Sequence, residues 1–172
     1  MSEPISPKDL AVSRIDRLDL SVLRLLVEEP RVGVREFARR LAVARGTVQN
    51  RIERLQRNGV LVSFRPEVSP EGMGFTVLAY VHLHLAQGRL DETIDQLAAI
   101  PQVIAADSIA GEGDLLCHVV GADNADLEGV IQSILAIPGV IRSRTEVVLS
   151  RRIRPRVTPL IDHLTAELDR VR

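Results

Sequence analysis

The residues best suited to chemistry lie between positions 34 and 58, which read VREFARRLAVARGTVQNRIERLQRN. Residues 31–65 hold nine arginines and two glutamates, a net charge of +7. Arginine, glutamine and asparagine each form paired hydrogen bonds to base edges in the major groove of DNA. The stretch therefore predicts a surface that binds double-stranded DNA. Its candidate contacts are Arg45, Thr47, Gln49, Asn50, Arg51 and Arg54.

Two short helices must position these side chains. The first begins after Gly33 and buries three apolar residues, Phe37, Ala38 and Leu41. The second runs from about Gly46 to Asn58, and its apolar residues recur at helical intervals: Val48, Ile52 and Leu55. A preceding helix starts near Asp16, which can cap it, and ends at Glu29-Pro30.

In a helix-turn-helix, the N-terminal part of the second helix reads the bases. We therefore expect Gln49 and Asn50 to read bases, and Arg45, Arg51 and Arg54 to contact phosphates. The alternative is a helix pair whose basic face is only solvated. The combination of three short helices, a tight turn and a basic block favours DNA binding.

Composition and periodicity divide the chain into five segments. They are a flexible N-terminus (1–13), a helix-turn-helix DNA-binding domain (14–65), a linker (66–74), a ferredoxin-like oligomerisation domain (75–150), and a C-terminal extension helix (151–172). Residues 66–149 hold three arginines and twelve acidic residues, so the charge changes sign at the linker. Val60–Arg65 is rich in β-formers and predicts a small wing or a linker strand.

The second domain alternates between strand and helix patterns. The expected strands are Thr76–Leu85, Val103–Ala110, Asp114–Val120 and Val140–Leu149, and the expected helices are Leu90–Ile100 and Leu127–Ile137. The first of these helices is expected to turn Ile94, Leu97 and Ala98 inward. An internal repeat supports the order, because Leu97–Ile104 matches Ile134–Ile141 around prolines 37 residues apart.

The predicted fold class is α+β: an N-terminal helix-turn-helix (winged-helix-like) domain and a C-terminal ferredoxin-like βαββαβ effector domain. In that fold both helices cover the same face of the sheet. The other face carries Leu78 and Tyr80, and exposed apolar surface of this kind indicates an interaction site. Two sheets packed face to face would form a homodimer, and paired helix-turn-helix units read two half-sites.

Other candidate sites have simpler interpretations. His82, His84 and His118 could bind a metal, but they are better explained as polar groups within a sheet-sheet interface. The single cysteine, Cys117, fits a small buried residue and excludes an internal disulfide. No catalytic set and no cofactor motif emerges, so we expect a protein that is not an enzyme.

Two further features concern localisation and the C-terminus. Neither a signal sequence nor an apolar run long enough to span a membrane is evident, which favours a cytoplasmic protein without a membrane partner. A helix after Pro155 carries an apolar stripe: Leu160, Ile161, Leu164 and Leu168. It would either dock on a neighbouring subunit or sheet edge, or form a frayed tail.

Several motifs together resemble the leucine-responsive/asparagine-operon regulator (Lrp/AsnC, feast/famine) family. The opening helices carry Ile15-Asp16-x-x-Asp19 and Glu36-Phe37-Ala38, and the recognition helix carries Thr47-Val48-x-x-Arg51-Ile52. Further on, Gly111-x-x-Asp114-Leu115 is similar to the family's G-x-x-D loop, and Leu135-x-x-Pro138-Gly139-Val140 to its last helix-strand junction. The resemblance covers about residues 14–150 in the family's order.

This resemblance implies a bacterial or archaeal transcription regulator that forms dimers and often assembles to octamers. It also implies that residues 75–150 form a ligand-binding domain. A small effector, an amino acid, would bind between two such domains and modulate assembly or DNA affinity. The loop Gly111, Glu112, Gly113, Asp114 and Leu115 would then hold the ligand, whereas its spacing alone predicts a tight turn. The rival interpretations are an amino-acid-binding adaptor and a small-molecule enzyme on the ferredoxin-like domain, both without DNA binding.

The sequence departs from the family pattern in two places. The family's usual Gly-Leu-Ser before the recognition helix is Ala42-Val43-Ala44 here. Alanine cannot cap a helix, which costs about 1 kcal/mol of local stability. The aromatic residue often found in the G-x-x-D loop is Gly113.

Overall fold

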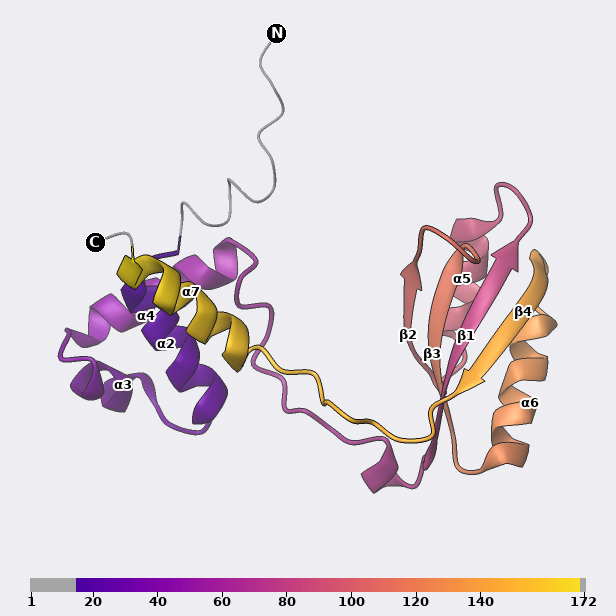
Figure 1. Ribbon diagram of the computed structural model, residues 1–172, viewed down its shortest axis with the longest axis horizontal. Coiled ribbons are helices and arrows are strands. Elements are labelled where there is room, and N and C mark those ends of the chain that lie inside the picture. The colour runs from indigo at the N-terminus through magenta and orange to yellow at the C-terminus, as the bar shows by residue number, and fades with distance from the viewer. Residues whose placement is uncertain (1–14, 171–172) are drawn as a thin grey trace, which may run out of the picture. The chain divides into compact units, whose positions relative to one another are not determined.

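The computed structural model describes residues 15–170, which divide into two compact units (Figure 1). The first unit holds residues 15–66 and 154–170, and the second holds residues 67–153. Each unit has its own cluster of buried apolar residues, as expected of a domain with its own core. Among the described residues, no helix is both long and apolar enough to cross a membrane.

The described part of the first unit, residues 15–66 and 154–170, contains four helices. They are α2 (Arg17–Glu28), α3 (Val34–Arg40), α4 (Arg45–Arg57) and α7 (Thr158–Arg170). The predicted cap of α2 is confirmed, because the Asp16 carboxylate accepts a hydrogen bond of 3.0 Å from the backbone N–H of Asp19. Gly59 follows α4 with φ +69°, a left-handed conformation that glycine adopts without strain and that often ends a helix.

Helix α7 packs on α2, a placement that the sequence did not predict. Ile161 is buried in the core of the first unit, and Leu164 and Leu168 pack against the same core. An ion pair of 2.8 Å joins Arg17 on α2 to Asp169 on α7. The C-terminal helix is therefore part of the first unit and its core, neither a separate extension nor a frayed tail.

The segment between the helices and the second unit is irregular. No strand forms at Val60–Arg65, so the predicted wing or linker strand is wrong for these residues. Apolar side chains that a wing would bury are exposed instead, including Val62 and Phe64. A short 3-10 helix, η1 (Glu71–Met73), precedes the second unit's first strand.

The second unit is a four-stranded antiparallel sheet with two helices. Its elements are β1 (Val77–Leu85), α5 (Leu90–Ala98), β2 (Val103–Ser108), β3 (Leu115–Gly121), α6 (Asn124–Leu135) and β4 (Val140–Val147). The strand order is β2-β3-β1-β4, and every neighbouring pair is antiparallel. This βαββαβ arrangement confirms the predicted ferredoxin-like fold.

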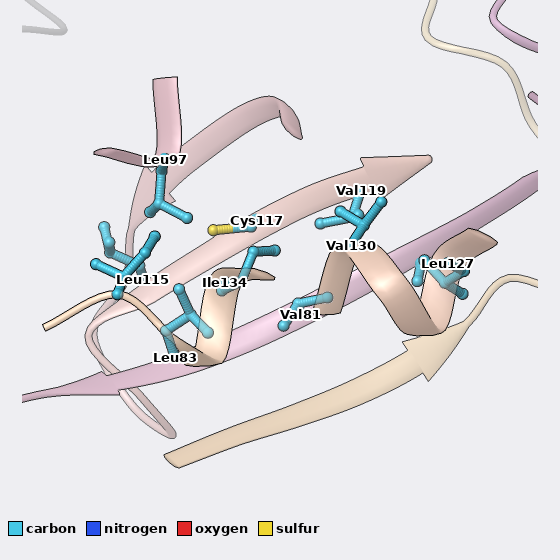
Figure 2. Packing of buried hydrophobic residues seen from close by; sticks show 11 residues of the cluster. Val81, Leu83, Leu97, Leu115, Cys117, Val119, Leu127, Val130 and Ile134 are labelled. Atoms are coloured by element: carbon cyan, nitrogen blue, oxygen red, sulfur yellow. The ribbon is translucent and has the colours of Figure 1, made fainter. Parts of the chain in front are cut away.

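Both helices cover the same face of the sheet, and the core lies between (Figure 2). Val81 and Cys117 are fully buried there, and burial raises the pKa of the Cys117 thiol to about 11. The predicted inward face of α5 is partly wrong. Leu97 is buried as expected, but Thr93 is buried in place of Ile94, which is 39% exposed, and Ala98 is exposed too.

The opposite face of the sheet is not covered by a helix of this unit. Strand register brings Tyr80 on β1 opposite His118 on β3, with ring centroids 4.9 Å apart in an edge-on contact. His82 lies one step along the same face, and its Nδ1 is 3.2 Å from the carbonyl oxygen of Glu112. Residues 15–170 contain no cluster of side chains that could hold a metal ion.

Candidate functional site

Helix α4 has one buried face and one exposed face. Val48, Ile52 and Leu55 hold it against α2 and α3. On the other side Arg45, Gln49 and Asn50 are exposed, and Thr47 is half-buried. Four of the six predicted DNA contacts thus lie in the first turns of the helix, where a recognition helix reads bases.

The remaining two predicted contacts point elsewhere. Arg51 and Arg54 form ion pairs with Asp16 and Asp19 at the start of α2. Arg51 also lies 3.3 Å from Asp19, and its side chain is only 25% exposed. The expectation that both guanidinium groups face outward is therefore not met. In this structure they fasten the recognition helix to α2.

The carboxylates at the start of α2 explain this placement. Asp19 is fully buried, and a buried carboxylate is costly unless it is paired and hydrogen-bonded. Burial also raises the pKa of Asp16, but hydrogen bonds from the Asp19 backbone N–H and from Arg51 outweigh it, so this pKa lies below its usual 3.8. The arginines of α4 thus stabilise two negative charges at the N-terminus of α2.

Helix α3 neutralises more of the basic block. Glu36 accepts hydrogen bonds from Arg39 at 2.6 and 2.8 Å and from Arg40 at 2.9 Å. These bonds, to Arg39 first and Arg40 second, lower the pKa of Glu36 to about 2. Arg40 also pairs with Glu29. Much of the positive charge at residues 31–65 is therefore balanced inside the unit.

The turn between α3 and α4 has unusual backbone geometry. Ala42 has φ +52°, the only positive φ of a non-glycine residue among the described residues. The left-handed region brings the alanine Cβ close to the following carbonyl oxygen. Ala44 is the N-cap of α4 and makes no side-chain hydrogen bond to the helix. The departure from Gly-Leu-Ser therefore leaves both a strained turn and an uncapped recognition helix.

In the second unit the candidate ligand loop is tied to the end of β1. The Asp114 N–H donates to the Leu83 carbonyl at 2.8 Å, and the Asp114 carboxylate accepts from the Leu85 N–H at 2.7 Å. Gly113 has φ +99°, and a Cβ there would lie 3.1 Å from the Leu83 oxygen. In this loop conformation an aromatic residue at position 113 would be strained, which accounts for the glycine.

The other members of the loop differ in exposure. Glu112 is exposed and pairs with Arg144 of β4, a partner that the sequence analysis did not identify. Gly111 is exposed as well, with φ +135°. Leu115 is buried in the core, so its side chain does not face the solvent. The strand register identifies Arg144, because β4 pairs with β1 and places Arg144 opposite His82.

Comparisons with known proteins agree with both units. Residues 15–56 match the AsnC-type helix-turn-helix domain, and residues 78–158 match the Lrp/AsnC ligand binding domain. The HTH-type transcriptional regulator Ptr1 of Methanocaldococcus jannaschii is 32% identical over 63% of this chain and 74% of its own length.

Solved structures share the fold of this chain. The structure of E. coli AsnC superposes with a TM-score of 0.77 at 24% identity, covering 84% of this chain and 99% of that one. A feast or famine regulatory protein from M. tuberculosis, complexed with L-methionine, gives a TM-score of 0.73 at 28% identity, with coverage of 82% and 96%.

A helix-turn-helix DNA-binding domain joined to a ligand-binding domain defines a transcriptional regulator whose activity responds to a small effector. The chain belongs to the Lrp/AsnC family of such regulators.

Proposed function

We propose that this regulator binds double-stranded DNA as a homodimer or larger homo-oligomer such as an octamer, with one α4 helix for each half-site. The exposed polar face at the start of α4 carries the proposal. Gln49 and Asn50 would read base edges, while Arg45 and Thr47 would contact the sugar-phosphate backbone of the DNA. Arg51 and Arg54 would act by positioning the helix, because their ion pairs with α2 already engage them.

The uncovered sheet face supports self-association. Leu78, Tyr80 and Leu116 lie half-buried on it and would be covered by a second copy of the same sheet. An isologous contact of this kind gives the two-fold symmetry that paired half-sites require. Polar groups such as His82 and His118 would lie inside the interface.

A titration of DNA from the protein's own upstream region tests this function. Asn50→Ala is expected to weaken binding to the preferred sequence by about 1–3 kcal/mol while leaving non-specific binding unchanged. Fluorescence anisotropy with a preferred and a scrambled duplex gives the ratio of the two affinities. Sedimentation gives the number of chains bound per duplex. Gln56→Ala, an exposed change near the end of α4, is the matched control. Equal affinity of the unmodified protein for both duplexes, or one chain per duplex, contradicts the proposal.

We further propose that an amino acid binds at the loop from Gly111 to Leu115 and changes assembly or DNA affinity. The loop's exposed backbone and the paired charges of Glu112 and Arg144 could meet the ammonium and carboxylate of such a ligand. Support comes from the M. tuberculosis relative, whose structure holds L-methionine.

Thermal shift against the twenty amino acids tests the effector. A ligand present at 100 times its Kd is expected to stabilise the native state by about 2.7 kcal/mol. Glu112→Gln should reduce the shift, while Glu128→Gln, an exposed change on α6, should not. Thermal shifts of equal size in both variants would show that the amino acid binds elsewhere than this loop.

A further inference from the structure

The chain from Val147 to Ile161 contains four arginines and no acidic residue. The basic arm, residues 151–156, holds all four: Arg151, Arg152, Arg154 and Arg156. All four are exposed, and the arm is neither helix nor strand. Pro155 favours an extended backbone here, because it removes a backbone donor and disfavours helix in the residue before it.

The arm's charges are not used within the described part of the chain. None of its four arginines forms an ion pair among residues 15–170, whereas Arg39, Arg40, Arg51 and Arg54 of the helix-turn-helix are all paired. The acidic residues of the adjacent helix α7 are occupied as well. Asp162 pairs with Arg24, Asp169 with Arg17, and Glu167 lies 3.3 Å from His163.

Helix α7 holds the C-terminal half of the arm, with Arg154 and Arg156, at the DNA-binding unit. The α7 backbone starts directly after the arm, where the Ile161 N–H donates to the Val157 carbonyl at 3.2 Å. Ile161 is only 6% exposed and is anchored in the core that also holds α4. Arg154 is seven residues from this anchor, so it stays within about 25 Å even in a fully extended chain.

We propose that the basic arm is a second DNA-binding surface, which contacts backbone phosphates of the duplex that α4 reads. An extended, arginine-rich segment suits this partner, because phosphate contacts need charge and reach rather than a fixed side-chain pattern. The proposal rests on DNA binding by the helix-turn-helix and adds contacts that carry affinity without sequence preference. It also gives α7 a role, which is to keep the arm beside the DNA.

The test compares three full-length proteins by fluorescence anisotropy across a salt series. They are the unmodified chain, a variant with all four arm arginines changed to glutamine, and a matched variant with all four changed to lysine. The glutamine variant is expected to bind the preferred and the scrambled duplex more weakly, by roughly tenfold or more in each case. Its slope of log K against log salt should fall by about 1 for each arginine that contacts a phosphate. The lysine variant should keep most of the affinity and the slope.

Other outcomes overturn the proposal. An unchanged slope in the glutamine variant shows that the arm does not touch DNA, and tighter binding shows that the arm instead meets acidic residues of the protein. A loss confined to the preferred duplex would assign base reading rather than phosphate contact. Failure of DNA binding itself is distinguishable, because the unmodified chain would then bind neither duplex.

Discussion

Replacing Asp19 with alanine is expected to destabilise the helix-turn-helix unit by about 3 kcal/mol. Asp19 is fully buried and accepts hydrogen bonds from Arg51, Arg54 and the Asp16 backbone N–H. The substitution removes the buried charge that both arginines neutralise, together with half of the capping box of α2. The value lies at the low end of the range for buried ion pairs, because Arg51 and Arg54 are partly exposed and can be solvated again.

Hydrogen exchange of the α4 amides, read by mass spectrometry, measures this loss in the first unit alone. Three kcal/mol corresponds to a fall in protection of roughly two orders of magnitude. Asp162→Ala is the matched control, since it breaks an exposed ion pair between α7 and Arg24 and should cost no more than about 1 kcal/mol. Equal losses in the two variants would show that the buried network does not hold the recognition helix.

This network also shows where sequence reasoning stops. Helical periodicity correctly separated Val48 and Ile52 from the polar face of α4. It could not distinguish polar residues that meet solvent from those that meet another helix, because their partners lie some 35 residues earlier. One signal was available: the i, i+3 spacing of Asp16 and Asp19 matches that of Arg51 and Arg54.

Other elements were predictable to different degrees. Strand β1 follows the alternation of its sequence, and the proline-marked repeat at 101 and 138 ends both helices within two residues of the predicted ends. The phase of α5 was wrong because its nine residues are too few to separate Ile94 from Thr93 as the buried position. The apolar stripe of α7 was visible, but a stripe does not identify the surface it packs on. Only the folded chain shows that α2 is that surface.

Changing Ala42 to glycine and Ala44 to serine together is expected to stabilise the first unit by about 2 kcal/mol. Glycine at position 42 relieves the left-handed strain, which costs an alanine about 1 kcal/mol or more. Serine at position 44 can accept a hydrogen bond from the Gly46 or Thr47 N–H, a cap worth about 1 kcal/mol. The extended backbone of Ala44, with φ −65° and ψ 146°, already suits a capping residue.

The single and double variants form a cycle that separates the two contributions. Protection of the α4 amides should rise about fivefold for each single change, and the two effects should be close to additive because strain and capping act on different atoms. Ala99→Gly is the control for glycine itself, because Ala99 lies at the exposed end of α5 with φ −80°. This change should slightly lower the stability of the second unit. If Ala42→Gly lowers protection as well, the positive φ is not a source of strain. A stiffer start of α4 should also tighten binding to the preferred duplex, because less ordering of the helix is then left for the binding step.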